Sequence, residues 1–178
     1  MMLYLFLTDG VEELEAIAPL DILRRAGVAV QTVGIGGKTV TGSHGIAIAC
    51  DIAPHEMDMP ACEGVILPGG PGRARLAESE AVRDALAAAA AKGGLLAAIC
   101  GSPPILGRLG YLRGRRACCY GGLEDGLAGA EICYDPVVTD GNVITSRGAG
   151  TAVAFGLAMV EYLISPEKAR EVAAQIQC

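Results

Sequence analysis

Short runs of β-type residues alternate with helical patterns along most of this chain, and that alternation limits the folds open to it. Strands are predicted where such runs are bounded by Gly, Pro or Asp, at residues 2–7, 28–35, 63–67 and 95–99. Helical periodicity is found over residues 12–25, 79–92, 102–109 and 151–164. Parallel strands need a crossover, usually a helix, so the alternation predicts an α/β fold with a mostly parallel sheet. At 178 residues the chain fits a single domain, over residues 1–178.

Three further elements complete the predicted topology. A β-ribbon is expected over residues 38–50, with Gly36-Gly37 as its turn. A hairpin is expected to join strands near 132–138 and 142–145, and a closing helix spans 166–177. In the helix at 151–164, Thr151 is the expected N-cap, and an apolar stripe should face the sheet, formed by Val153, Leu157, Val160 and Ile164.

Composition narrows the classes of partner. Hydrophobic residues make up 52% of the chain and charged residues 19%, which excludes a disordered chain and indicates either a large buried fraction or a subunit interface, as in a homo-oligomer. The net charge of −6 offers no basic field for nucleic acid or anionic lipid. No apolar run reaches the roughly 18–20 residues of a membrane helix, since Lys92, Arg108 and Glu161 interrupt the candidates. The apolar start meets Asp9 without a basic leader, so no signal peptide is expected.

Cys100 is the cysteine whose position points to chemistry. The seven cysteines, without CxxC spacing, favour free thiols in the reducing cytoplasm, and neither structural zinc nor another cofactor is predicted. Cys100 follows the uncharged strand at 95–99 and precedes the turn sequence Gly101-Ser102-Pro103-Pro104. A thiol at the end of a parallel strand, facing a helix N-terminus, is expected to be partly ionised at neutral pH. The alternative is a small buried hydrophobic side chain, as most free cysteines are.

Two nearby motifs bear on Cys100. Glu15 stands four residues before Pro19, which has no N–H for the Glu15 carbonyl, so we expect an irregular turn there. A carboxyl at this point could donate a hydrogen bond to sulfur or move a proton; the alternative is that it only favours the helix dipole. Gly69 and Gly70 follow the strand at 63–67 and could present N–H donors to an oxyanion, the alternative being an ordinary strand-to-helix turn.

Five segments, in chain order, carry a family resemblance: Asp9–Glu15, Asp21–Gly27, Leu67–Gly70, Ala97–Cys100 and Thr145–Thr151. Together they resemble the ThiJ/PfpI superfamily, in the branch typified by the Parkinson-disease protein deglycase (DJ-one), and they span nearly the whole domain. The resemblance implies a flavodoxin-like three-layer α/β sandwich that is usually a homodimer. It also implies that Cys100 is a nucleophile at an elbow, that Glu15 is its carboxyl partner, and that backbone donors near the sulfur come from Gly69, Gly70 and Gly101.

The chain departs from this branch near the thiol. Tyr120, in Cys118-Cys119-Tyr120, stands where human-like members carry a histidine, so no Cys–His dyad is expected. His44 falls where related proteins place an arginine that reaches the partner subunit's site, which gives the hypothesis that His44 approaches the Cys100 of a second copy. Gly101 disfavours a protease, because the proteases of the superfamily have a histidine directly after the nucleophile. The Gly-x-Cys-x-Gly elbow of glutamine amidotransferases is also absent.

Two functions stay open on the sequence. One is a cofactor-free enzyme of the glyoxalase III or deglycase type, acting on reactive carbonyls such as methylglyoxal or on glycated groups, with Cys100 as nucleophile and Glu15 as acid and base. The other is a redox-responsive stress protein or chaperone in which Cys100 is oxidised and Cys118 or Cys119 acts as a resolving thiol. For those two cysteines the alternative is that neighbouring strand residues, pointing to opposite faces, only fill space.

Overall fold

A six-stranded sheet forms the centre of the molecule, with strand order β2-β1-β5-β6-β10-β9. This computed structural model describes residues 2–178. Every neighbouring pair is parallel except β10 with β9, which run antiparallel at the edge. The predicted α/β fold with a mostly parallel sheet is confirmed. The strands of this sheet are β1 (Met2–Thr8), β2 (Val30–Ile35), β5 (Cys62–Leu67), β6 (Leu95–Ile99), β9 (Val137–Asp140) and β10 (Val143–Ser146).

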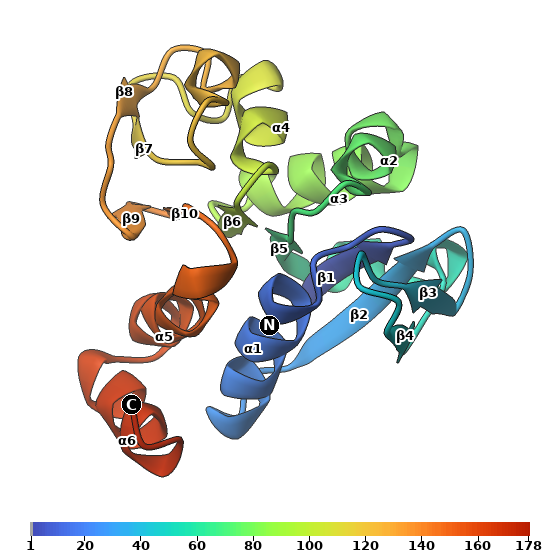
Figure 1. The fold of residues 1–178 in the computed structure, drawn as a ribbon, viewed down its shortest axis with the longest axis horizontal. Coiled ribbons are helices and arrows are strands. Elements are labelled where there is room, and N and C mark those ends of the chain that lie inside the picture. The colour runs from blue at the N-terminus through green and yellow to red at the C-terminus, as the bar shows by residue number, and fades with distance from the viewer. Residues whose placement is uncertain (1) are drawn as a thin grey trace.

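Helices cover both faces of the sheet and give three layers (Figure 1). One face carries α1 (Glu13–Arg25), α5 (Ala152–Leu163) and α6 (Pro166–Gln175). The other carries α2 (Arg73–Glu78), α3 (Glu80–Ala91) and α4 (Pro103–Arg108). Side chains of β1 alternate between the two cores, because successive residues of a strand point to opposite faces. Leu3, Leu5 and Leu7 pack under α1 and α5, while Tyr4 and Phe6 pack under α3.

The predicted β-ribbon is present, but its turn lies elsewhere. Strands β3 (Thr39–Thr41) and β4 (Ala47–Ala49) pair antiparallel. The turn between them is closed by the Gly42 N–H, which donates to the Ile46 carbonyl at 2.9 Å. Gly36-Gly37, the turn expected from the sequence, instead links β2 to β3, with both glycines at positive φ. The hairpin is present as β9–β10, but its first strand spans Val137–Asp140 where residues 132–138 were predicted. The closing helix is found as α6.

The buried face of α5 differs from the predicted stripe. Val160 is buried, but Val153 and Ile164 are 37% and 46% exposed. The helix is apolar on nearly every side, so its periodicity could not identify the inner face. That face is set by close packing on α1, since a Cβ at Gly156 would stand 2.9 Å from Ile22 Cδ1. The Thr151 side chain makes no capping bond to α5; its hydroxyl bonds to Ser146 Oγ and to the Gly148 carbonyl.

Helix α1 runs without interruption through Pro19, so Glu15 lies in a regular first turn and the expected irregular turn is wrong. At Pro19 this helix packs closely on α5, since Pro19 Cα lies 3.1 Å from the position a Gly156 Cβ would take. Three short elements were not anticipated: α2 and the two-residue strands β7 (Arg116–Ala117) and β8 (Glu131–Ile132). Among the described residues, no helix combines the length and apolar character that crossing a bilayer requires.

The carboxyl ends of the central strands meet at one edge of the sheet. Strands β1, β5, β6 and β10 run in the same direction and are neighbours, so their final residues lie close together. In an open α/β sheet this edge is where ligand sites collect. The loops that follow β1, β5 and β6 carry the residues that the sequence singled out.

Candidate active site

Cys100 occupies a sharp strand-to-helix elbow after β6. Its φ of 64° lies in the left-handed region, which is rare for a residue with a side chain and is concentrated at functional sites. The elbow is held by backbone bonds on both sides: the Cys100 N–H donates to the Ser146 carbonyl at 2.8 Å, and the Tyr120 N–H donates to the Cys100 carbonyl at 2.8 Å. The buried Ser102 hydroxyl donates to the Pro68 carbonyl at 2.7 Å and ties the elbow to the turn after β5. The thiol is therefore fixed at the sheet edge and half-buried.

The backbone N–H groups of Gly70 and Gly101 face the Cys100 sulfur and act to lower the pKa of its thiol, which favours the ionised form. Gly70 has a φ of 92°, and a Cβ there would stand 2.5 Å from the Glu12 nitrogen, so only glycine fits. Gly69 has a different role from the one expected. Its N–H donates to Glu15 Oε2 at 2.8 Å instead of to the sulfur.

Glu15 is the buried carboxyl beside the thiol, with 1% of its surface exposed. Oε2 accepts the Gly69 N–H, whereas Oε1 is buried without a hydrogen-bond partner among residues 2–178. Burial raises the pKa of Glu15, and the interactions with the Cys100 thiol and the Gly69 N–H offset only part of that rise. A carboxyl with so few donors favours its protonated form.

Cys100 and Glu15 form a coupled acidic pair. Burial is the main cause that raises the pKa of Cys100 to about 12, the Glu15 carboxylate adds to it, and the Gly70 and Gly101 donors oppose it. Two acids in one buried site do not readily ionise together, so the pair keeps one proton after it has lost the other. The expectation that a helix N-terminus would ionise the thiol is not supported. Helix α4 has six residues and begins with Pro103 and Pro104, which have no N–H to offer.

Comparison with known proteins identifies the family to which this arrangement belongs. A sequence profile described as the DJ-1/PfpI family matches residues 1–162. The chain belongs to the DJ-1/PfpI family. Among curated relatives, protein dj-1beta of Drosophila melanogaster is 39% identical over 171 residues, covering 94% of this chain and 91% of that protein. The solved structure of oxidised DJ-1 from Toxoplasma gondii superposes with a TM-score of 0.94 at 29% identity, covering 99% of this chain and 97% of that one.

Two relatives within this DJ-1/PfpI group have names that state an activity. A glutathione-independent glyoxalase of Caenorhabditis elegans is 36% identical over 162 residues, covering 90% of this chain and 87% of that protein. A deglycase of Pyrococcus abyssi is 31% identical over 165 residues, covering 92% of this chain and 99% of that protein. A reactive-carbonyl activity is therefore represented in the family.

The thiol opens into a hollow of about 310 Å³, which we call the thiol hollow. Its lining is mostly apolar or glycine and includes one basic side chain: Gly70, Pro71, Arg73, Cys100, Gly101, Tyr120, Gly121 and Leu123. Tyr120, predicted as an auxiliary residue, does line it and is 57% exposed. Arg73 could not be predicted as a site residue, because nothing in the local sequence indicates that α2 begins beside the thiol.

The other candidate residues predicted from the sequence, Cys118, Cys119 and His44, do not line the thiol hollow. Cys118 and Cys119 are buried free thiols; the Cys118 N–H donates to Thr145 Oγ1, and Cys119 borders a neighbouring hollow that Tyr120 also lines. His44 Nδ1 is 2.8 Å from Glu13 Oε2 in the same chain. Glu12, Glu13 and His44 place potential metal-ligand atoms within 4.8 Å of one another, but Glu13 and His44 already bond to each other.

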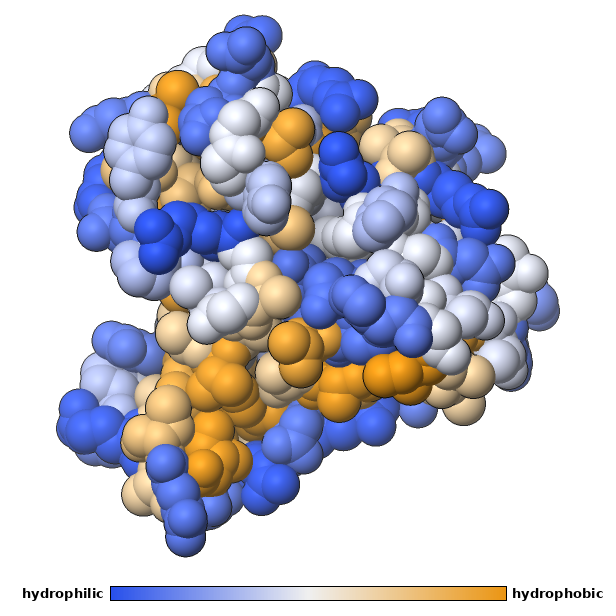
Figure 2. Space-filling view, viewed as in Figure 1, coloured by the Kyte–Doolittle hydropathy of each residue, from blue (hydrophilic) through white to orange (hydrophobic). Residues whose placement is uncertain are grey.

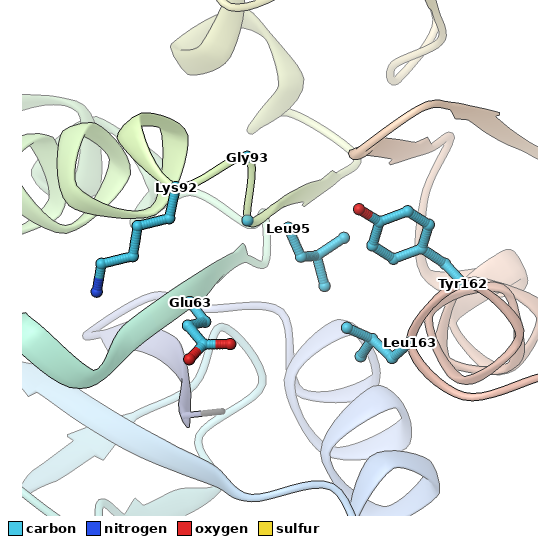
Figure 3. A pocket seen from close by; sticks show the side chains of 7 residues that line it. Glu63, Lys92, Gly93, Leu95, Tyr162 and Leu163 are labelled. Carbon is cyan, nitrogen blue, oxygen red and sulfur yellow. The ribbon is translucent and has the colours of Figure 1, made fainter.

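A larger hollow of about 500 Å³ lies at the opposite end of β5 and β6 (Figure 3). In this view Tyr162 reaches from α5 toward Leu95 and Gly93, and Lys92 points away from them. The Lys92 ammonium donates to the backbone carbonyls of Pro60 and Cys62. No cysteine or histidine is among the residues that line this larger hollow.

Proposed function

We propose that this protein is a cysteine-dependent, cofactor-free enzyme acting on reactive carbonyls, as a glyoxalase III or deglycase. The observation that carries the proposal is the pairing of a buried, proton-holding Glu15 with a Cys100 thiol that backbone N–H groups face at the floor of the thiol hollow. A nucleophile, a proton carrier and donors for a developing oxyanion are the parts that aldehyde addition needs. The relatives named glyoxalase and deglycase support this reaction class.

The first step is addition to the aldehyde of methylglyoxal. The one proton shared by the pair passes from the Cys100 thiol to Glu15, which leaves a thiolate. The Cys100 sulfur then forms a bond to the aldehyde carbon, the carbonyl electron pair moves to oxygen, and that oxygen takes the proton from Glu15. The N–H groups of Gly70 and Gly101, which face the sulfur, stabilise the oxyanion as it forms. The product of this step is a hemithioacetal on Cys100.

The remaining steps are proton transfers and a hydrolysis. Glu15, now ionised, removes the proton from the carbon bound to sulfur, and the resulting enediol is reprotonated on the adjacent carbon to give a lactoyl thioester. Water then cleaves the S–C bond, which releases lactate and restores the thiol. Methylglyoxal plus water equals lactate, so the sequence needs no external oxidant or reductant.

Lactate formation tests this function directly. The wild type, Cys100→Ala and Cys118→Ala are incubated with methylglyoxal, and lactate is measured. Cys118 is the matched control, because it is a buried free cysteine that does not line the thiol hollow. We expect Cys100→Ala to lose activity to the uncatalysed level and Cys118→Ala to keep it. Equal rates for the wild type and Cys100→Ala would refute the proposal.

We also propose that the enzyme is a homodimer through the exposed apolar face of α1 and α5. Figure 2 shows apolar residues gathered over this side of the molecule. Leu14 and Ile17 of α1 and Val153 of α5 contribute to it, with exposures of 59%, 43% and 37%. A contiguous apolar face of this kind marks an interaction surface. Light scattering should give twice the chain mass for the wild type and the single-chain mass for Ile17→Glu; a monomeric wild type would exclude the dimer.

Redox response is the second candidate, favoured by the same donors at the sulfur. The N–H groups of Gly70 and Gly101 could bind the oxygens of an oxidised Cys100, and a protonated Glu15 could donate to them. All seven cysteines are free, which favours a reducing compartment such as the cytoplasm. Mass spectrometry after mild peroxide separates the roles, because a Cys100 that stays reduced while other thiols oxidise would rule out a sensor.

A further inference from the structure

We propose that the thiol hollow binds substrates whose carbonyl carries an anionic group, a carboxylate or a phosphate, and that Arg73 is the residue that binds this group. The inference rests on the proposed function and specifies its substrate class. Arg73 would hold the anion at the rim while the carbonyl lies against Cys100 on the floor.

Arg73 lies directly against the elbow. A Cβ at Gly101 would stand 2.5 Å from Arg73 Cδ and 2.7 Å from Nε, so the arginine side chain lies across the glycine whose N–H faces the sulfur. The same side chain lines the thiol hollow. The guanidinium is therefore beside the nucleophile, within the reach of a small substrate.

Among residues 2–178, the guanidinium of Arg73 has no hydrogen-bond or ion-pair partner. Of the fourteen basic side chains, eleven bond to a carboxylate or a backbone carbonyl. Within residues 2–178, those without such a bond are Arg73, Arg108 and Arg113. Arg73 lines the thiol hollow, and Arg108 lines two adjoining hollows that Arg73 and Gly101 also line. Unpaired guanidinium groups at a concave site, with five fixed donors each, suit carboxylate or phosphate.

Glu15, buried beside the sulfur, is the acidic group next to the thiol hollow, and no Asp or Glu is among the residues that line it. Asp125 and Glu78 border the outer hollows that Arg108 shares with Arg73. Glu124 borders the hollow on the far side of Tyr120, and its carboxylate accepts the Gly122 N–H at 2.8 Å. The local cation therefore acts against a net charge of −6 on the whole chain, which would otherwise repel an anionic substrate.

A pair of alkylating reagents tests the proposal without relying on turnover. Iodoacetate and iodoacetamide both react by forming an S–C bond and releasing iodide, and they differ in that iodoacetate is an anion. The rate constants for Cys100 are measured at low salt by peptide mass spectrometry, with the exposed Cys178 of the same chain as internal reference. We expect the iodoacetate-to-iodoacetamide ratio to be about fivefold higher at Cys100 than at Cys178, the effect of one close charge partly screened by water.

Substitution of the arginine should remove that preference. Arg73→Gln is expected to lower the Cys100 ratio about fivefold, Arg73→Lys to keep part of it, and Arg108→Gln to change it less. Arg113→Gln is the matched control, an exposed and unpaired arginine away from the hollow, and it should leave the ratio unchanged. An unchanged ratio in Arg73→Gln, or an equal slowing of both reagents, would overturn the proposal; so would equal ratios at Cys100 and Cys178 in the wild type.

Protection experiments identify the anion and keep the two proposals separable. At constant ionic strength, acetate or inorganic phosphate should slow iodoacetamide labelling of Cys100 in the wild type and not in Arg73→Gln, and the stronger protector indicates carboxylate or phosphate. If neither acetate nor phosphate slows the labelling of Cys100, the proposed anion-binding role of Arg73 is contradicted. Failure of lactate formation with the iodoacetate preference intact would refute the glyoxalase proposal alone, whereas turnover without that preference would refute the anion subsite alone.

Discussion

Glu13 and Glu15 are both buried in the first turn of α1, yet their surroundings shift their pKa values in opposite directions. Burial alone would raise the pKa of Glu13. Hydrogen bonds from the His44 ring, the His44 N–H at 2.7 Å and the Ser43 hydroxyl at 3.2 Å outweigh it and lower the pKa to about 2. Glu15 has one backbone donor and an unpartnered oxygen, so burial keeps its pKa raised.

The contrast shows how one helix turn provides both a structural and a chemical carboxyl. Glu13, fully supplied with donors, is a fixed anion that anchors the β3–β4 turn to α1. Glu15 lacks those donors and lies against a thiol, so it can hold a proton and release it. Both are glutamates with buried side chains, 7% exposed at Glu13 and 1% at Glu15. The number of hydrogen-bond donors is the difference that separates their roles.

Activity should show the largest difference between the two glutamates. We expect Glu15→Gln to lower the rate of lactate formation from methylglyoxal by about a hundredfold or more, the usual contribution of a positioned acid–base group. Glu13→Gln removes a carboxylate that does not contact the sulfur, and it should stay within about twofold of the wild type. Similar losses in both variants would mean that the two carboxyls share a structural role.

Stability should reverse the order of the two variants. We expect Glu13→Gln to lower the free energy of unfolding at pH 7 by about 1–3 kcal/mol, the range for hydrogen bonds to a charged group. Because the folded-state pKa of Glu13 is depressed, its contribution is present above its usual pKa of 4.5 and is lost as the pH falls toward about 2. Urea titrations between pH 2 and pH 7 measure the difference between this variant and the wild type.

Glu15 should give the opposite pH dependence in the same titrations. Its folded-state pKa is raised, so the wild type loses stability as the pH rises from 4.5 through that raised value. Glu15→Gln has no such group and should gain stability relative to the wild type over that interval. Parallel pH profiles for the two variants would contradict the assignment of opposite shifts.

The smallest expected effect is on His44. Its hydrogen bond to Glu13 raises the pKa of the imidazole above the usual 6.5. Glu13→Gln should therefore lower that pKa toward 6.5, and Glu15→Gln should leave it unchanged, as followed by the NMR titration of the His44 ring protons. An equal shift in both variants would contradict the assignment of the raised His44 pKa to its hydrogen bond with Glu13.

Much of this fold could be predicted, because the core strands are uninterrupted apolar runs separated by helices with clear periodicity. What escaped prediction depends on tertiary contacts. Helix α2 has a largely polar sequence, RARLAE, with one buried residue, Leu76, so it lacks a periodic signal. The inner face of α5 is set by Gly156 against Ile22, which periodicity could not show in a helix that is apolar all round.

In the candidate site, too, the features set by local sequence could be predicted and those set by tertiary contacts could not. The Cys100 elbow and the turn at Gly69 and Gly70 could be located from strand ends, and Glu15 was identified as the carboxyl partner through family resemblance. The partners of the glycine N–H groups could not be predicted. The Gly69 N–H donates to Glu15 and the Gly70 N–H faces the Cys100 sulfur only because of how two loops pack together. Arg73 was missed for a similar reason, since its neighbour Gly101 lies 28 positions away in the sequence.

The pH dependence of Cys100 alkylation tests the shared proton of the Cys100–Glu15 pair most directly. Iodoacetamide labelling is followed from pH 4 to pH 11 in the wild type, in Glu15→Gln and in the control Glu13→Gln. For the wild type and Glu13→Gln we predict two rises in rate, one where the pair loses its first proton and another toward the pKa of about 12 at which Cys100 loses the last. Glu15→Gln should show a single rise. A single rise near the ordinary thiol value of 9.0 in all three proteins would contradict the account.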